Sequence, residues 1–244
     1  MKTLNNSNMI FNFKRKLILV FVFAIAMGFL ESVVVVYLRY MFYQSGFKFP
    51  MTVIPNSILN AELVRELCTI VMIVAVSWLA GKNRTQRFSY FLFSFAVWDI
   101  LYYIGLKLFL DWPQSFFTWD ILFLIPVPWV GPVLAPVICS VTMIILSIIM
   151  LYGEPNNIKL NKREWILIYL GALIIFISFV WDYSGMILSG KLNSESISQI
   201  TSTYIPQYYR WDFFTIGMLI IWIALILMIS RIRRSSFSKN KSEM

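Results

Sequence analysis

The sequence predicts an all-α fold, a polytopic transmembrane bundle of about six helices, and three observations support this prediction. The chain is 59% apolar and only 14% charged, whereas a soluble domain carries about 25% charged residues. Its mean hydropathy is +0.73. Several apolar stretches reach the roughly 20 residues that cross a bilayer. We expect a basic N-terminus at 1–16, one membrane domain at 17–230 and a basic tail at 231–244.

Windows of sustained hydrophobicity place the six spans near 17–38, 58–80, 88–110, 130–152, 165–188 and 211–230. The first span follows the basic stretch KRK at 14–16 and resembles a signal peptide, with a cleavage-like sequence at 24–26. Its hydrophobicity nevertheless continues to Leu38 without a polar mature start. This continuity favours an uncleaved first span.

Prolines interrupt the approach to the fourth span. They are Pro126, Pro128, Pro132 and Pro136, and an uninterrupted helix does not accommodate such a series. We therefore expect a Pro-broken segment near 121–132, with a short helix from Ile121 before the break; a Pro-kinked helix is the alternative. Irregular backbone at membrane depth persists where protein covers it or where it lines a wet cavity. Residues 119–132, with Trp129 as a contact residue, are thus a candidate pocket wall.

Basic residues alternate between the two sides of the predicted bundle. Fifteen of the 21 lysines and arginines lie in the N-terminus, the 81–87 and 153–164 loops and the tail. The positive-inside rule therefore places both termini in the cytoplasm. The net charge of +9 follows from this topology, so we expect anionic lipid, and not nucleic acid, at the basic termini. The residue usage and short loops suit a bacterial cytoplasmic (inner) membrane.

Histidine is absent from the chain, which excludes haem and zinc sites with histidine ligands as well as Ser-His-Asp catalysis. The two cysteines, Cys68 and Cys139, fall within predicted spans and form no CxxC motif. We interpret them as small apolar core residues. The cofactor is unknown; a divalent cation held by carboxylates is compatible with the sequence.

Most of the acidic residues map to the outer half of the predicted bundle. Eight of the 12 lie between the bilayer midplane and the outer surface: Glu31, Glu62, Glu66, Asp99, Asp111, Asp120, Asp182 and Asp212. Carboxylates within a bilayer are costly and normally face a cavity or a partner. This distribution predicts a polar pocket that opens to the extracytoplasmic side.

Helix ends account for some of these acids without any function. Asn56, Ser57 or Asn60 is a candidate cap of span two, Asp120 is a candidate cap of the short helix that follows it, and Asp212 lies in the first turn of span six. A tryptophan precedes each of four aspartates, which is typical of an interfacial aromatic belt. For Asp120 and Asp212 we favour this structural interpretation.

The helix-end explanation fails for Glu31, Asp99 and Asp182, because the outer ends of their spans are C-termini. At a rise of about 1.5 Å per residue, Asp99 lies about 16 Å from the start of its span, Glu31 about 21 Å and Asp182 about 25 Å. Something must solvate these three carboxylates. They are the leading functional candidates, and we expect them to converge on one site.

Helical spacing suggests partners for these acids. Asp99, Tyr103 and Lys107 share one helix face at i, i+4 and i+8, and Glu31 and Arg39 are likewise eight residues apart.

A second group, Glu62, Arg65 and Glu66, follows an i, i+3, i+4 pattern. Arg65 either clamps a carboxylate of another helix or a bound anion, or neutralises its two neighbours; the two roles are compatible.

Three functions remain open on the sequence. The first is binding or transport of a cation or an amine-bearing small solute at the acidic pocket. The second is an enzyme that acts on a lipid or lipid-linked substrate in the outer leaflet by carboxylate acid–base or metal-assisted chemistry. The third is a non-catalytic accessory or assembly subunit whose buried charges pair with one another or with a partner.

Overall fold

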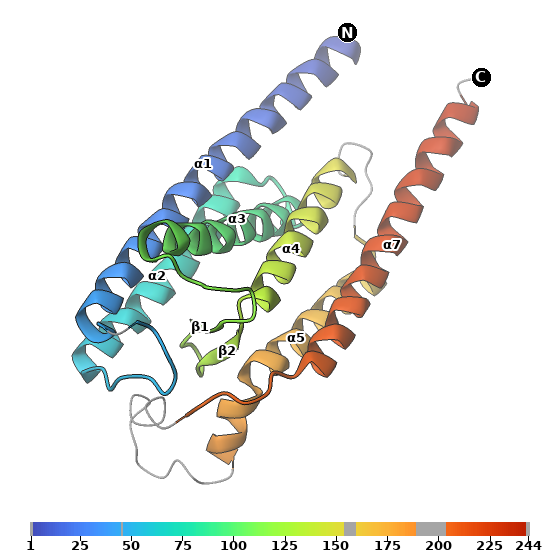
Figure 1. Cartoon of the computed structure of the whole chain (residues 1–244). Helices are drawn as coiled ribbons and strands as arrows, with labels where there is room; N and C mark the ends of the chain where they lie inside the picture. The colour runs from blue at the N-terminus through green and yellow to red at the C-terminus, as the bar shows by residue number, and fades with distance from the viewer. Residues whose placement is uncertain (1, 45, 154–159, 189–203, 243–244) are drawn as a thin grey trace.

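Six long helices and one short β-hairpin make up the described part of the computed structural model, residues 2–44, 46–153, 160–188 and 204–242 (Figure 1). In chain order they are α1 (Lys2–Phe42), α2 (Asn56–Ala80), α3 (Arg84–Leu110), β1 (Trp119–Phe123), β2 (Trp129–Pro132), α4 (Leu134–Gly153), α5 (Lys162–Leu188) and α7 (Trp211–Ser242). The start of α1 and the end of α7 lie at the same end of the molecule (Figure 1).

All six helices are long and apolar enough to cross a membrane, which confirms the predicted bundle. The candidate spans are Lys14–Phe42, Asn56–Ala80, Arg84–Leu110, Leu134–Tyr152, Lys162–Leu188 and Trp211–Arg234. Each predicted span falls largely within one of them. Large apolar side chains point outward, as Leu79 and Leu188 do with exposures of 82% and 87%. Such outward apolar faces fit a lipid environment.

Helix α3 is the centre of the N-terminal group, where it packs against α1, α2 and α4. Its contact with α1 is close because Gly28 has no side chain. A Cβ added there would lie 2.8 Å from the Trp98 carbonyl oxygen. Small residues allow such close approach between membrane helices.

Helices α5 and α7 form a second closely packed pair. Gly171 and Gly217 face each other, and a Cβ added at either residue would lie 2.7 Å from the carbonyl oxygen of the other. This pair joins the rest of the molecule through α4 and β2.

The connection between α3 and α4 contains an antiparallel β-hairpin where we expected a short helix (Figure 1). Trp119 pairs with Pro132 and Ile121 with Val130, and the register shifts between Ile121 and Phe123. The helix predicted from Ile121, with Asp120 as its cap, is therefore wrong. The strands pair their backbone groups with each other, and β2 lies against α4 and α5.

Two smaller expectations are also corrected. Pro55 occupies the N-cap of α2 and no side chain caps that helix, so Asn56, Ser57 and Asn60 do not have the predicted role. Cys68 is exposed on α2 and Cys139 is partly buried on α4. The core interpretation is therefore wrong for Cys68.

Candidate functional site

Arg65 lies between two helices and binds a carboxylate from each of them. Its guanidinium forms an ion pair with Glu31 of α1, and its Nε donates to Glu62 of the same helix, α2, at 2.9 Å. Thr69 also donates to Glu31, at 3.4 Å. Arg65 thus binds a carboxylate of another helix and also pairs with Glu62, one of the two neighbours predicted for it, because a guanidinium has donors enough for two carboxylates.

Glu66 faces the hairpin and not Arg65. Its two carboxylate oxygens lie 3.0 and 3.1 Å from the backbone nitrogen of Leu124, which follows β1. The Glu66 side chain is buried. This contact gives the Leu124 N–H an acceptor where the strand pairing has ended, and it attaches the hairpin to α2.

Arg39 and Asp120 make a second contact between a helix and the hairpin. The Arg39 Nη2 atom lies 3.4 Å from Asp120 Oδ1, and Tyr103 donates to Asp120 Oδ2 at 3.2 Å. The guanidinium also stacks on the rings of Phe47 and Trp112, at 4.5 and 3.7 Å from their centroids. Burial raises the pKa of the Asp120 carboxyl to about 6, although Arg39 and Tyr103 act in the opposite direction.

Asp99 bonds to α4 and not to the side chains predicted as its partners. Ser140 donates to its Oδ2 atom at 2.7 Å. Tyr103 donates instead to Asp120. Lys107 is half exposed and pairs with Asp111 at 2.7 Å, since its long side chain extends toward the end of the helix. The predicted interaction between Asp99 and Lys107 is therefore wrong.

The acidic side chains in the interior of the bundle are all paired with other groups of the protein. The carboxylates of Glu31, Glu62, Glu66, Asp99 and Asp120 each have a hydrogen bond or an ion pair within the described residues. In the same part of the chain, no group of three or more acidic or cysteine side chains could hold a metal ion. The interior acids thus join α1, α2, α4 and the hairpin to their neighbours.

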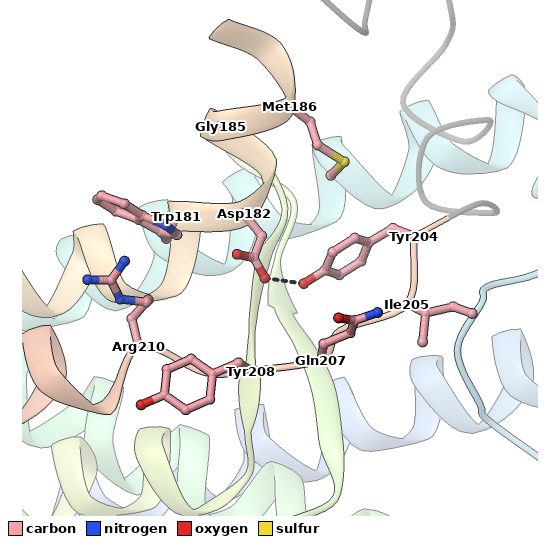
Figure 2. Close-up of a pocket in the computed structure, with 9 residues that line it drawn as sticks. All are labelled: Trp181, Asp182, Gly185, Met186, Tyr204, Ile205, Gln207, Tyr208 and Arg210. Atoms are coloured by element: carbon pink, nitrogen blue, oxygen red, sulfur yellow. Dashed lines mark hydrogen bonds between the residues drawn. The ribbon is translucent and has the colours of Figure 1, made fainter. Parts of the chain in front are cut away.

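Asp182 lies elsewhere, in an open pocket of about 620 Å³ between the end of α5 and the segment that precedes α7 (Figure 2). The described residues that line it are Trp181, Asp182, Gly185, Met186, Tyr204, Ile205, Gln207, Tyr208 and Arg210. Of the three leading acids, Asp182 alone is among the described residues that line this pocket. Glu31 binds Arg65 and Thr69 of α2, and Asp99 binds Ser140 of α4.

The Asp182 carboxylate points toward the Tyr204 hydroxyl, while Trp181 and Arg210 lie on its other side (Figure 2). Tyr204 donates a hydrogen bond to Asp182 Oδ2. Burial and the nearby carboxylate raise the pKa of Tyr204 well above its usual range. The phenol therefore remains protonated at neutral pH and acts as the donor.

Arg210 is neutralised by a different acid. Its Nε and Nη2 atoms lie 2.9 and 2.6 Å from the two carboxylate oxygens of Asp212. The guanidinium also lies 4.4 Å from the ring centroid of Trp181 and 4.3 Å from that of Phe213. The position of Asp212 in the first turn of α7 agrees with the structural interpretation.

The sequence indicated Asp182 but not the residues around it. Tyr204, Tyr208 and Arg210 were not candidates, although the segment at 203–211 combines three tyrosines with a tryptophan and an arginine. Trp129, which was a candidate, does not line this pocket within the described residues. It donates to the Ile125 carbonyl at 2.8 Å and its ring packs against α5.

No protein-family model matches the chain, and comparisons with characterised proteins and with solved structures found no significant match.

Proposed function

We propose that this integral membrane protein binds a small cationic or amine-bearing solute in the pocket around Asp182. The observation that supports the proposal is the contrast between two kinds of acid. The interior acids are engaged by arginines, a serine or a backbone N–H, whereas Asp182 borders open space and bonds to a neutral phenol. A carboxylate beside a cavity is a natural partner for a cation.

The proposed orientation places this pocket on the extracytoplasmic side. It lies at the C-terminal end of α5, and the predicted cytoplasmic loops and termini lie at the opposite ends of the helices. Under this proposal the bacterial cytoplasmic membrane holds both basic termini on its inner face, next to anionic lipid. A solute from outside the cell would then enter the pocket without crossing the bilayer.

Direct binding tests the proposal. The purified full chain is titrated calorimetrically with K⁺, Mg²⁺, Ca²⁺ and a series of alkylammonium ions, and the titrations are repeated with Asp182→Asn. Asp111→Asn is the matched control, because Asp111 is an exposed acid at the end of another helix. We expect at least one cation to bind to the parent protein and to the control, with a binding constant reduced at least tenfold by Asp182→Asn.

Two results would contradict the proposal. One is the absence of any binding that depends on Asp182 across the whole series. The other is equal weakening by Asp182→Asn and Asp111→Asn, which would indicate a diffuse effect of surface charge.

A further inference from the structure

We infer that the ligand of the Asp182 pocket is an organic cation of the methylated ammonium class, and not a metal ion. This inference rests on the proposed function and specifies its ligand. It depends on three properties of the described lining residues: their aromatic rings, their net charge and their apolar groups.

Three aromatic side chains line the pocket that contains the carboxylate. Trp181 precedes Asp182 on α5, Tyr204 donates to it, and Tyr208 lies on the same side of the pocket as Arg210 (Figure 2). The faces of such rings attract cations, and groups of them with a carboxylate are the usual recognition surface for quaternary ammonium ions. The ring of Trp181 already lies against one cation of the protein, the guanidinium of Arg210.

The charge of the pocket suits a monovalent cation. Asp212 pairs with Arg210 through two hydrogen bonds, and Arg210 also acts on Asp182 electrostatically without an ion pair to it among the described residues. Asp182 is therefore the one charged lining residue, among those the structure describes, that no ion pair engages. Ca²⁺ and Mg²⁺ take six or more oxygen ligands, with carboxylates among them. The described residues offer no cluster of three acidic or cysteine side chains for such an ion.

Apolar groups provide a surface for methyl substituents. Met186 and Ile205 line the pocket beside the aromatic rings. A primary ammonium requires three hydrogen-bond acceptors, whereas a trimethylated one requires none and gains from apolar contact. The volume of about 620 Å³ exceeds that of one trimethylammonium group, so a substituent on the cation also fits. The same chemistry occurs in free solutes and in lipid headgroups.

Calorimetric titration of the full chain with tetramethylammonium, choline, methylammonium and Ca²⁺ separates the ligand classes. We expect tetramethylammonium and choline to bind about tenfold more tightly than methylammonium. Tyr208→Leu should weaken choline binding about fivefold, whereas Tyr208→Phe keeps the ring and should have no effect. Asp182→Asn should abolish the binding of all of them.

A competition experiment identifies the source of the cation. Short-chain phosphatidylcholine is added to the choline titration, with phosphatidylglycerol of the same chain length as the control. Competition by the choline lipid alone supports the ligand class and assigns it to a headgroup. Absence of competition, with choline still bound through Asp182, supports the class and assigns it to a free solute.

The inference and the proposed function fail in different ways. If Ca²⁺ or methylammonium binds through Asp182 more tightly than choline, or if Tyr208→Leu and Tyr208→Phe behave alike, the methylated class is wrong while cation binding stands. If no cation binds through Asp182, the proposed function is wrong and the inference falls with it.

Discussion

Both carboxylate oxygens of Glu66 on α2 lie within hydrogen-bond distance of one backbone N–H, that of Leu124 at the end of β1. The acid therefore completes the hydrogen bonding of a strand that belongs to another part of the chain. A buried N–H without an acceptor costs about 1 to 3 kcal/mol. Glu66 thus explains how the hairpin keeps a fixed position among the helices.

Glu66→Leu should lower the free energy of unfolding by about 1 to 3 kcal/mol, because it leaves the Leu124 N–H without an acceptor. Hydrogen exchange at Leu124 should become faster, as measured by mass spectrometry on the protein in detergent. Glu66→Gln keeps one acceptor oxygen and should have a smaller effect. Glu62→Gln is the control, because Glu62 pairs only with Arg65 among the described contacts; if it accelerated exchange at Leu124 equally, the assignment would be wrong.

Removing Arg39 should destabilise the protein more than removing the charge of its partner. Arg39→Met leaves the Asp120 carboxylate buried without its cation, at a cost of about 3 kcal/mol. Adding Asp120→Asn to that variant removes the unpaired buried carboxylate. The double variant should therefore regain most of the stability that Arg39→Met loses. Thermal unfolding of the two single variants and the double variant measures this coupling. Strict additivity of the two effects would contradict a direct interaction.

The contribution of Asp120 to the free energy of unfolding should fall as the pH rises from about 4 to about 6. Burial raises the pKa of folded Asp120 to about 6 from its ordinary value of 3.8, so the folded state binds more protons than the unfolded state between these values. The contribution is therefore complete below the unfolded pKa and is lost as the pH passes the folded one, a change on the order of 3 kcal/mol.

Asp120→Asn lacks this titration, so its stability should change less over that pH interval. Chemical denaturation of both proteins at several pH values provides the comparison, and parallel curves would show that Asp120 does not carry the effect.

Gly171→Ala should weaken the packing of α5 against α7, because the new Cβ would lie 2.7 Å from the Gly217 carbonyl oxygen and 2.6 Å from the Ile221 side chain. Overpacking of this kind costs about 1 to 3 kcal/mol. Gly185→Ala is the control in the same helix, since a Cβ there meets nothing within 4 Å. It should raise the melting temperature slightly through the higher helix propensity of alanine.

Cysteine labelling tests the proposed orientation. In a variant without Cys68 and Cys139, a cysteine is introduced at Gln114, between α3 and β1, or at Lys82, between α2 and α3. A membrane-impermeant maleimide should label Gln114→Cys in intact cells and Lys82→Cys only after permeabilisation. The reverse labelling pattern would show that the protein has the opposite orientation in the membrane.

The six helices were predictable because their hydrophobic length follows from the thickness of the bilayer. The hairpin was not, because 119–132 is apolar on nearly every residue and shows no alternation that would distinguish a strand from a helix. Its prolines excluded a regular helix. They did not indicate that β1 and β2 would pair with each other.

The candidate residues were predictable as polar groups within the bundle, but their partners were not. Spacing along one helix suggested Lys107 for Asp99, whereas Ser140 of α4 is the actual donor. Pairs within a helix follow from the helical repeat, as Glu62 and Arg65 show. Pairs between helices depend on rotation and depth, which no local pattern records.

The ion pairs of Arg39 and Arg65 belong to residues 31–120, whereas the described residues that line the pocket lie at 181–186 and 204–210. Architecture and recognition therefore occupy different stretches of one polypeptide. Substitutions in the aromatic segment at 204–210 would change the ligand that the protein binds. They would leave the ion pairs of Arg39 and Arg65, which join the helices to one another and to the hairpin, unchanged.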